Sequence, residues 1–245
     1  MDVSVIIPAR NERGFIGFML LALEQQIYDG SWEAIVVDNA SDDRTGDAVQ
    51  TAFPWVRVIE EPVPGVQRAR ERGRVSAKGA ILAFLDADTV PSVQWIENGL
   101  RYFRDPSIVA VTGSYDFYDS GPVLQLGARF VSACVYPVAL WFTQDIRHSG
   151  IMIGGNCFIR ACALEDIGGF NTAIDFWGDD TDTAIRLARV GRIAYARDVF
   201  ARTSARRYYR DGIVRTLWNY VYHAARISAC SFREQKHVVK SKARL

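Results

Sequence analysis

The sequence predicts an α/β fold with a Rossmann-like, mainly parallel central sheet, helices on both of its faces and a helical extension at the C-terminus. Two observations support this prediction. From Val3 to Asp88, short apolar runs alternate with segments of helical periodicity in the order β-α-β-α-β-α-β. Three of the apolar runs end in polar side chains, which a parallel sheet collects along one edge. The chain has room for one large domain and this extension.

The first half of the chain is expected to supply four strands and the helices between them. Each strand is a short apolar run, often β-branched, as is typical of strands covered on both faces. Pro8 is expected to end the first strand, and the acidic loop 38–43 supplies N-cap side chains for the second helix. The expected strands are 3–7, 34–37, 56–59 and 81–85, and the expected helices are about 15–26, the segment up to about Phe53, and 65–78.

The second half has clear boundaries but a weaker alternation. Gly168-Gly169-Phe170 predicts a tight turn, and Asp179-Asp180-Thr181-Asp182 opens a helix that Gly191 ends. Acidic residues in a first helical turn are also favoured by the helix dipole alone. The other expected elements are a helix at 95–103, strands at 108–113 and 193–195, a strand entered from the loop 154–160, and an amphipathic helix from Arg215.

Two carboxylates follow the fourth apolar run. In an extended chain, residues two apart point to the same side, so Asp86 and Asp88 are expected to reach one point beyond the strand. Two hard oxygen ligands suit Mg²⁺ or Mn²⁺ held together with substrate phosphates. A solvated turn before Pro91 could also have the sequence Asp-Ala-Asp. The motif therefore indicates a metal site only in combination with the rest of the chain.

Charge and cysteine content narrow the classes of function. The formal net charge is +1, which gives no bulk argument for nucleic-acid binding. The charge is uneven, because acidic residues gather at 38–47 and 175–182 whereas the segment from Arg189 onward is basic. The cysteines lack zinc-type spacing and are expected to be reduced, in a cytoplasmic protein without a signal peptide. The four cysteines are Cys134, Cys157, Cys162 and Cys230.

The segment 123–142 is apolar enough to raise the question of a membrane. Gln125, Arg129 and Pro137 argue against a spanning helix. Ser132 and Tyr136 continue the spacing of Gln125 and Arg129, so the four side chains form one polar stripe. The stripe fits either a buried helix with one wet edge or an interfacial helix beside an acceptor site. With the basic tail, the second alternative predicts peripheral docking on an anionic membrane, at its inner face.

Five segments together resemble family 2 glycosyltransferases of the GT-A fold. They are 3–12, 36–43, 65–79 leading into Asp86-Ala87-Asp88, 168–170 and 178–180. The resemblance implies a GT-A domain over 1–212, with a nucleotide-binding part at about 1–113 and an acceptor-binding part at about 114–212. Residues 213–245 would then form an amphipathic helix and a basic tail.

The resemblance also implies roles for individual residues. Asp86 and Asp88 would bind Mg²⁺ or Mn²⁺, Asp180 would be the general base, and Asp179 and Asp182 compete for that role. The nucleotide sugar would be bound by Pro8, Ala9, Asn11, Glu12, Asp38, Asn39, Arg70, Asp86 and Ala87. The acceptor side would include Gly154, Gly155, Asn156 and Asp179.

The implied activity is inverting, metal-dependent transfer of a sugar from a nucleoside diphosphate. The acceptor would be a saccharide, a lipid-linked saccharide or a polyprenyl phosphate, in the synthesis of cell-envelope polysaccharide, glycolipid or glycan. The alternative is an inactive nucleotide-sugar-binding subunit of an assembly complex. Three departures from the family pattern stand out: Asn39 replaces a common Asp, Asp179 replaces a common Glu, and no His lies close after Tyr195. The nearest downstream histidine, His223, is expected on the surface of a helix.

Overall fold

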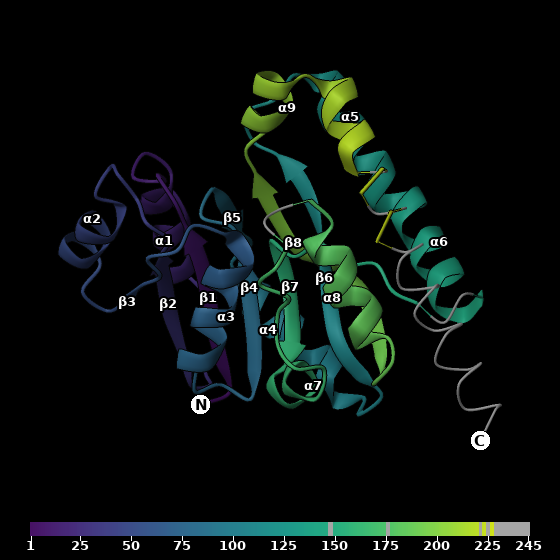
Figure 1. Ribbon diagram of the computed structural model, residues 1–245, viewed down its shortest axis with the longest axis horizontal. Helices are drawn as coiled ribbons and strands as arrows, with labels where there is room; N and C mark the ends of the chain where they lie inside the picture. The colour runs from purple at the N-terminus through teal and green to yellow at the C-terminus, as the bar shows by residue number, and fades with distance from the viewer. Residues whose placement is uncertain (147–148, 175–176, 221, 224–225, 228–245) are drawn as a thin grey trace.

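The computed structural model describes residues 1–146, 149–174, 177–220, 222–223 and 226–227. The strands described there form one eight-stranded mixed sheet in the order β3-β2-β1-β4-β7-β6-β8-β5 (Figure 1). Its strands are β1 (Val3–Ala9), β2 (Trp32–Asp38), β3 (Arg57–Glu60), β4 (Ile81–Leu85), β5 (Thr89–Pro91), β6 (Ile108–Phe117), β7 (Asn156–Arg160) and β8 (Arg192–Thr203).

The first four strands are parallel to one another, as the alternation predicts. Strand β7 then runs antiparallel between β4 and β6, so the second half of the sheet is mixed. The boundary expected near residue 113 falls inside β6, which pairs with β8 along its length. The helices are α1 (Ile16–Glu24), α2 (Thr45–Ala52), α3 (Val66–Ser76), α4 (Trp95–Arg101), α5 (Pro122–Phe130), α6 (Tyr136–Trp141), α7 (Ala161–Asp166), α8 (Asp179–Leu187) and α9 (Arg206–Asp211).

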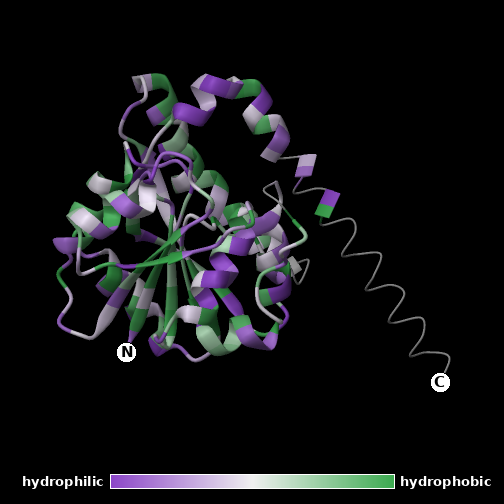
Figure 2. Cartoon of the chain, turned by 60° about the vertical axis from the view of Figure 1, so that its left-hand side comes forward, coloured by the Kyte–Doolittle hydropathy of each residue, from purple (hydrophilic) through white to green (hydrophobic). Residues whose placement is uncertain are grey.

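Hydrophobic clusters on the two faces of the sheet confirm that helices cover both. One cluster joins alternate residues of β1, such as Val5 and Ile7, to Met19 of α1. The other joins Ile6 to Ala69 of α3 and Leu187 of α8. The alternation along β1 follows from the two-residue period of a strand. Figure 2 shows the strands between these layers as mainly hydrophobic.

Strand β1 does not end at Pro8, contrary to the prediction. Pro8 and Ala9 continue the parallel register with Val37 and Asp38 of β2. On the other side, pairing with β4 ends at Ile6. Proline lacks the N–H that a strand with two partners uses, and here the strand borders only one partner at that position. The first strand therefore extends to the loop that follows it.

Residues 122–145 form one helix whose polar stripe faces the protein. Gln125 Nε2 donates to Phe117 O at 3.1 Å, and Ser132 Oγ donates to Tyr115 O at 3.3 Å. Between them, Arg129 Nη2 lies 2.8 Å from Asp116 Oδ2. The expectation of a buried helix with a wet polar edge is therefore wrong, because β6 offers polar partners and the apolar side is turned outward.

This helix also passes the length and hydropathy requirements for crossing a membrane. It has 24 residues, and its most apolar stretch of 18 residues has a mean hydropathy of 1.5 and is 6% buried. Composition alone therefore does not exclude a spanning helix, although Gln125, Arg129 and Pro137 were expected to do so. Pro137 does not end the helix, because the turn before it, Val131–Val135, is π-helical and accommodates the missing N–H.

The remaining expectations differ mainly in extent. The last strand, β8, is much longer than residues 193–195, because it pairs with β6 and with β5. The C-terminal helix begins at 213 and is described to residue 220, whereas most of the basic tail lies outside the described residues. Cys134, Cys157 and Cys162 are free, and Cys230 lies outside the described part of the chain.

Candidate active site

Asp86 and Asp88 lie in a tight turn between β4 and β5, not in an extended chain. Thr89 N donates to Asp86 O at 3.0 Å and closes this turn. The pKa of the partly buried Glu12 is raised, chiefly by burial. The charges of Asp88 and Asp86 add to this rise, so both carboxylates act on the same crevice. The pKa of Asp86 is also raised, chiefly by burial. The positive charge of Arg70 lowers this pKa, whereas the negative charges of Asp88 and Asp180 raise it further.

Arg70 joins the acidic groups of the crevice through one guanidinium. Its Nη1 lies 2.9 Å from Asp179 Oδ2 and 2.9 Å from Asp180 Oδ1. Its Nη2 lies 3.6 Å from Asp86 Oδ1. Burial lowers the pKa of Arg70, but the three carboxylates more than offset this and the pKa is raised. Arg70 is expected near the donor diphosphate, and the structure uses it to hold the expected base beside an expected metal ligand.

Two glycines make room for these carboxylates. A Cβ on Gly154 would lie 1.9 Å from Asp180 Oδ1, and a Cβ on Gly155 would lie 2.0 Å from Asp86 Oδ2. Gly154 N also donates to Asp180 Oδ2 at 2.9 Å. No side chain fits at either position without displacing a carboxylate. The residues expected on the acceptor side therefore position Asp86 and Asp180 directly.

Asp179 and Asp180 share the first turn of α8 but differ in surroundings. Gly178, with φ +87°, turns the chain into this helix. Asp179 is buried, and burial together with the charge of Asp180 raises its pKa well above the ordinary value, although Arg70 opposes this. The side chain of Asp180 is about a third exposed. Of the two carboxylates, Asp180 is thus the one that an acceptor can reach.

Arg206 of α9 forms a second cationic contact with the crevice. Its Nη2 is hydrogen-bonded to Glu12 Oε1 and lies 3.0 Å from Asp88 Oδ2. Its guanidinium also lies 4.4 Å from the centre of the Phe15 ring. Sequence reasoning missed this role and counted Arg206 with the basic tail. The available signal was its place just after the last strand, where the resemblance puts a further ligand.

The residues present fit a divalent cation only together with a substrate. In the described part of the chain, no three His, Cys, Asp or Glu side chains converge closely enough to hold a metal ion alone. Asp86 and Asp88 supply two hard oxygen ligands, and Glu12 Oε2 nearby is buried without a hydrogen-bond partner. Mg²⁺ and Mn²⁺ accept such a donor set when phosphate oxygens and water complete the shell. A nucleoside diphosphate would supply those oxygens.

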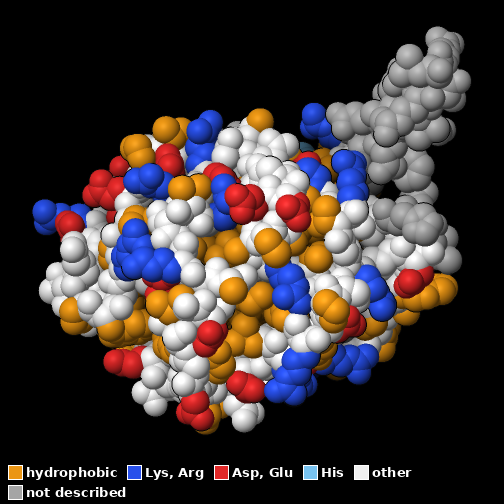
Figure 3. Space-filling model, turned by 90° about the horizontal axis from the view of Figure 1, so that it is seen from below, with side chains coloured by type: hydrophobic (Ala, Val, Ile, Leu, Met, Phe, Trp, Pro, Cys, Tyr) orange, Lys and Arg blue, Asp and Glu red, His pale blue; other side chains and the backbone are white. Residues whose placement is uncertain are grey.

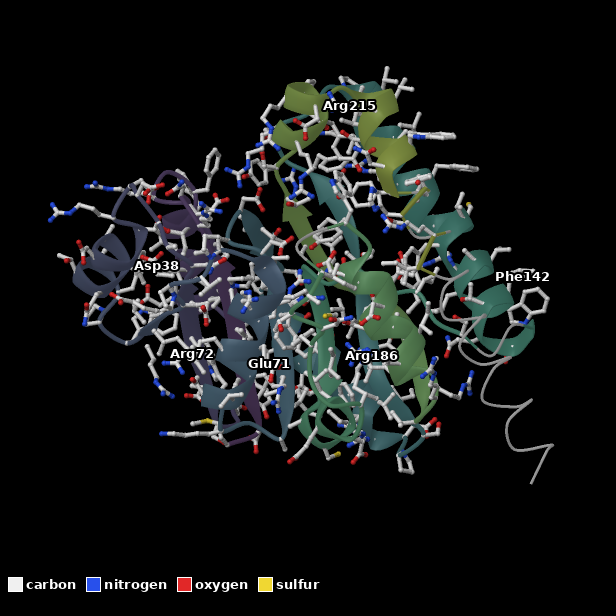
Figure 4. The ribbon with its side chains drawn as sticks, in the orientation of Figure 1. Asp38, Glu71, Arg72, Phe142, Arg186 and Arg215 are labelled. Carbon is white, nitrogen blue, oxygen red and sulfur yellow. The ribbon has the colours of Figure 1, made fainter. Side chains whose placement is uncertain are left out.

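Several residues expected to bind the nucleotide make hydrogen bonds to backbone groups of the surrounding loops. Asp38, labelled in Figure 4, accepts from Gly46 N at 2.9 Å and so caps α2. Asn39 donates to Glu61 O and Val63 O, at 3.0 and 2.8 Å. Its Oδ1 accepts from Gly65 N at 2.7 Å. These side chains order the rim of the crevice between β2 and α3.

Asn11 connects the first two of these loops. It has a positive φ of 57°, and its Oδ1 accepts from Asp42 N at 2.7 Å. Asparagine tolerates this left-handed conformation better than most residues. The loop after β1 is thereby held against the loop after β2. Ala9, buried at the end of β1, and Pro8 lead into it, and Ala87 is buried within the turn of Asp86 and Asp88.

Asn156 and His223 have surroundings that differ from those expected. Asn156 is fully buried, accepts from Trp95 Nε1 at 2.8 Å and donates to Ser114 O and Val199 O. It joins three strands and a helix in the interior instead of facing an acceptor. His223 was expected on the surface, but its ring stacks on that of Trp177 at a centroid distance of 5.9 Å. Trp177 lies just before Asp179, so His223 borders the base side of the crevice.

The sheet order, the loops at the strand ends and the acidic turn after β4 define a GT-A fold of the kind that binds nucleotide sugars. The chain belongs to glycosyl transferase family 2, whose model matches residues 4–168. It is 33% identical over 183 residues to glycosyltransferase AglE of Haloferax volcanii, covering 72% of this chain and 58% of that protein. It is 28% identical to the pre-mycofactocin glycosyltransferase of Mycobacterium tuberculosis, covering 87% of this chain and 45% of that protein.

Solved structures show the same fold. The mannosyltransferase PcManGT from Pyrobaculum calidifontis, in complex with GDP-Man and Mn²⁺, superimposes with a TM-score of 0.71 at 26% identity, over 91% of this chain and 63% of that one. TarS of S. aureus with UDP-GlcNAc has a TM-score of 0.59 at 19% identity, over 81% of this chain and 56% of that one. The chain spans about half the length of the curated relatives it matches.

Proposed function

We propose that this chain transfers a sugar from a nucleoside diphosphate sugar to an acceptor hydroxyl, with inversion at the anomeric carbon. The observation that carries the proposal is the single guanidinium of Arg70, which contacts both Asp180 and Asp86. A carboxylate suited to accept a proton is thereby fixed next to a carboxylate suited to bind a metal. That is the arrangement which a single displacement at the anomeric carbon requires.

In this mechanism, the loops after β1 and β2 bind the nucleotide. Asp180, about a third exposed, accepts the proton of the acceptor hydroxyl while the oxygen of that hydroxyl attacks the anomeric carbon. Gly154 N and Arg70 hold that carboxylate in one orientation. The bond to the distal phosphate oxygen breaks as the new bond forms, so the product has the inverted configuration. Mn²⁺ or Mg²⁺, held by Asp86 and Asp88, would neutralise charge on the departing diphosphate.

The solved relatives and the crevice together support an assignment of the donor class. PcManGT is described with GDP-Man and Mn²⁺, and TarS with UDP-GlcNAc. We therefore assign a hexosyl nucleoside diphosphate as donor and Mn²⁺ or Mg²⁺ as cofactor. The nucleotide part would lie over about 1–113 and the acceptor part over about 114–212. A saccharide or a lipid-linked acceptor in cell-envelope, glycolipid or glycan synthesis, on the cytoplasmic side of the membrane, completes the proposal.

A donor panel tests this proposal directly. The full chain is incubated with Mn²⁺, an acceptor panel and GDP- or UDP-hexoses, and nucleoside diphosphate release and the anomeric configuration of the product are measured. We expect release with at least one donor and a product of opposite configuration. Retention of configuration would contradict the mechanism. Tight donor binding without product, across all acceptors, would favour the inactive binding subunit.

Asp88→Asn tests the metal site in the same assay. Removing one ligand charge weakens cation binding, so we expect no measurable transfer at limiting Mn²⁺. The amide can still accept a hydrogen bond from Arg206, so the fold is expected to remain intact. Circular dichroism and thermal unfolding provide that control. Near-normal turnover at limiting Mn²⁺ would show that Asp88 is not a metal ligand.

A further inference from the structure

The helix of residues 122–145 presents a continuous apolar face to solvent. Its outward side chains recur every three to five residues, which keeps them on one side of the helix. Leu126 is 71% exposed and Val138 is 62% exposed. Scattered single exposures are ordinary, but a contiguous apolar surface marks an interaction site. We call this the outer face; it consists of Val123, Leu126, Phe130, Val135, Val138 and Trp141.

The opposite side of the same helix is tied to the sheet. Gln125, Arg129 and Ser132 bond to successive residues of β6. Further along, Gln144 donates to Ile193 O at 2.7 Å and accepts from Ile193 N at 2.8 Å. A helix that crossed a bilayer would have to leave these partners, and the polar side chains would then enter hydrocarbon unpaired. The helix can meet a membrane only by lying along its surface.

A second helical segment, residues 213–220, extends this surface. Its Val214 and Trp218 are exposed. Gly121 N donates to Tyr209 Oη at 3.2 Å, which joins the start of α5 to α9, the element just before this segment. Figure 4 shows Arg215 at this end of the molecule, on the segment that follows α9. Tryptophan and arginine together are typical of the boundary between headgroups and acyl chains.

Charge decides between a membrane and a second copy of the chain. Residues 206–245 are strongly basic in sequence, with only Asp211 and Glu234 as acidic residues. A second copy would bring the same positive charge to the contact, whereas an anionic bilayer would attract it. On the lower face of the molecule, by contrast, side chains of both signs are interspersed (Figure 3). Among the described residues, Arg207 and Arg210 lie on α9 and Arg215 lies on the 213–220 segment, next to the apolar surface.

We propose that the outer face and the 213–220 helix bind flat at the headgroup boundary of an anionic bilayer. If the chain is the proposed glycosyltransferase, this docking also implies a lipid-linked acceptor, and only that consequence rests on the proposed function. Segment 213–220 continues from α9, whose Arg206 contacts Glu12 and Asp88. Its Tyr220 ring packs on Trp177, just before Asp179. An acceptor held in the bilayer thus reaches the crevice beside the base.

Vesicle flotation of the full chain tests the docking without using activity. The probes are phosphatidylcholine vesicles with and without phosphatidylglycerol. Wild type is expected to float with the anionic vesicles, and the bound fraction should fall as the salt concentration rises. Removal of Arg233–Leu245 should weaken partitioning by about fivefold for each basic residue that lies near the surface. Leu126→Glu and Val138→Glu should each reduce partitioning by about tenfold or more, since each removes an apolar side chain from the contact.

Phe18→Glu is the matched control. Phe18 lies on α1 and is 70% exposed, like Leu126, but it is not part of the outer face. Its partitioning should equal that of wild type. Loss equal to that of Leu126→Glu, or no binding of wild type to either kind of vesicle, would overturn the proposal. So would a wild-type dimer that Leu126→Glu dissociates, as measured by light scattering.

Val135, on the outer face at the middle of the helix, is the position that reports its depth. Lipids brominated near the headgroup should quench the fluorescence that Val135→Trp adds to wild type more than lipids brominated near the chain ends. The reverse order would mean a spanning helix and would overturn the flat orientation. Donor binding is measured separately by thermal shift. Flotation without donor binding would contradict the proposed function and support the docking. Donor binding without flotation would support the proposed function and contradict the docking.

Discussion

Two arginines hold the carboxylates of the crevice, and they do so in different surroundings. Arg70 comes from the middle of α3, is 6% exposed and contacts three carboxylates. Arg206 comes from the short α9, is 38% exposed, contacts two carboxylates and lies over the Phe15 ring. A buried charge is costly to leave unpaired, whereas an exposed pair is screened by water. Arg70 is therefore a fixed part of the fold, and Arg206 is exchangeable.

This difference separates two tasks within one crevice. The carboxylates around Arg70 are expected to keep their positions when a donor binds, which would preorganise the proposed base. The carboxylates around Arg206 include Asp88, which a metal ion would need. A half-exposed guanidinium can leave Asp88 when a cation and a diphosphate arrive. The predictions that follow test this division, from the largest expected effect to the smallest.

Asp180→Asn is expected to lower turnover by roughly two to four orders of magnitude, the usual contribution of a positioned general base. The amide can still bond to Gly154 N, so donor affinity should change little. Initial rates and donor thermal shifts measure the two effects. Asp179→Asn is the matched variant on the same turn. If Asp179→Asn were inactive and Asp180→Asn active, the base would be Asp179.

Arg70→Ala is expected to cost about 3–5 kcal/mol of unfolding free energy, because it leaves the buried Asp179 without its partner and removes a contact of Asp180 and Asp86. Urea unfolding measures this, and the midpoint should fall without a large change in slope. The control is Arg72→Ala, on the exposed side of the same helix (Figure 4), with an expected change within about 0.5 kcal/mol. Equal costs for the two variants would remove the distinction between the fixed and the exchangeable arginine.

Arg206→Ala is expected to cost no more than about 1 kcal/mol of stability, as for other partly exposed ion pairs. Because Arg206 competes for Asp88, its removal should strengthen Mn²⁺ binding in the presence of a nucleoside diphosphate by up to about fivefold, the equivalent of that energy. Calorimetric titration with Mn²⁺ measures this. Arg210→Ala, which removes an exposed arginine paired only with Asp211 among the described ion pairs, is the control. Weaker Mn²⁺ binding in Arg206→Ala would show that Arg206 is not a competitor.

Asp179→Asn is expected to change the pH dependence of stability. The folded-state pKa of Asp179 is raised, so its stabilising contribution is complete below the unfolded pKa and is lost as pH rises through the folded pKa. The stability of the variant relative to wild type should therefore increase from about pH 4 upward. Unfolding curves at several pH values measure the difference. A relative stability that falls with rising pH would mean that Arg70 holds the pKa of Asp179 low.

The acidic loops were predictable because their positions depend on neighbours in sequence. Strand β4 is apolar on both sides and must end where Asp86 begins, so the carboxylate appears at the sheet edge. The first turn of α8 likewise places Asp179 and Asp180 from local signals alone, because Gly178 turns the chain and acidic residues suit a helix start. These features need no knowledge of which elements pack together.

Other features depend on contacts between distant residues. Arg206 pairs with Glu12 across a separation of 194 residues, and the sequence around Glu12 does not indicate this contact. Asn39 and Asn156 are polar residues near strand ends, yet loop and strand carbonyls take up their amides. A buried amide must be satisfied by whatever group the fold brings close, and only tertiary packing decides whether that group is protein or ligand.

The helix of residues 122–145 shows the same limit for a whole element. Its periodicity in sequence determined that one side is polar and the other apolar. Which side faces the protein depended on β6, where Asp116 and the carbonyl groups of Tyr115 and Phe117 accept the polar side chains. Periodicity determines which residues share a face of a helix. It does not determine which surface each face contacts. Only the fold supplies that surface, and here it turned the apolar side outward.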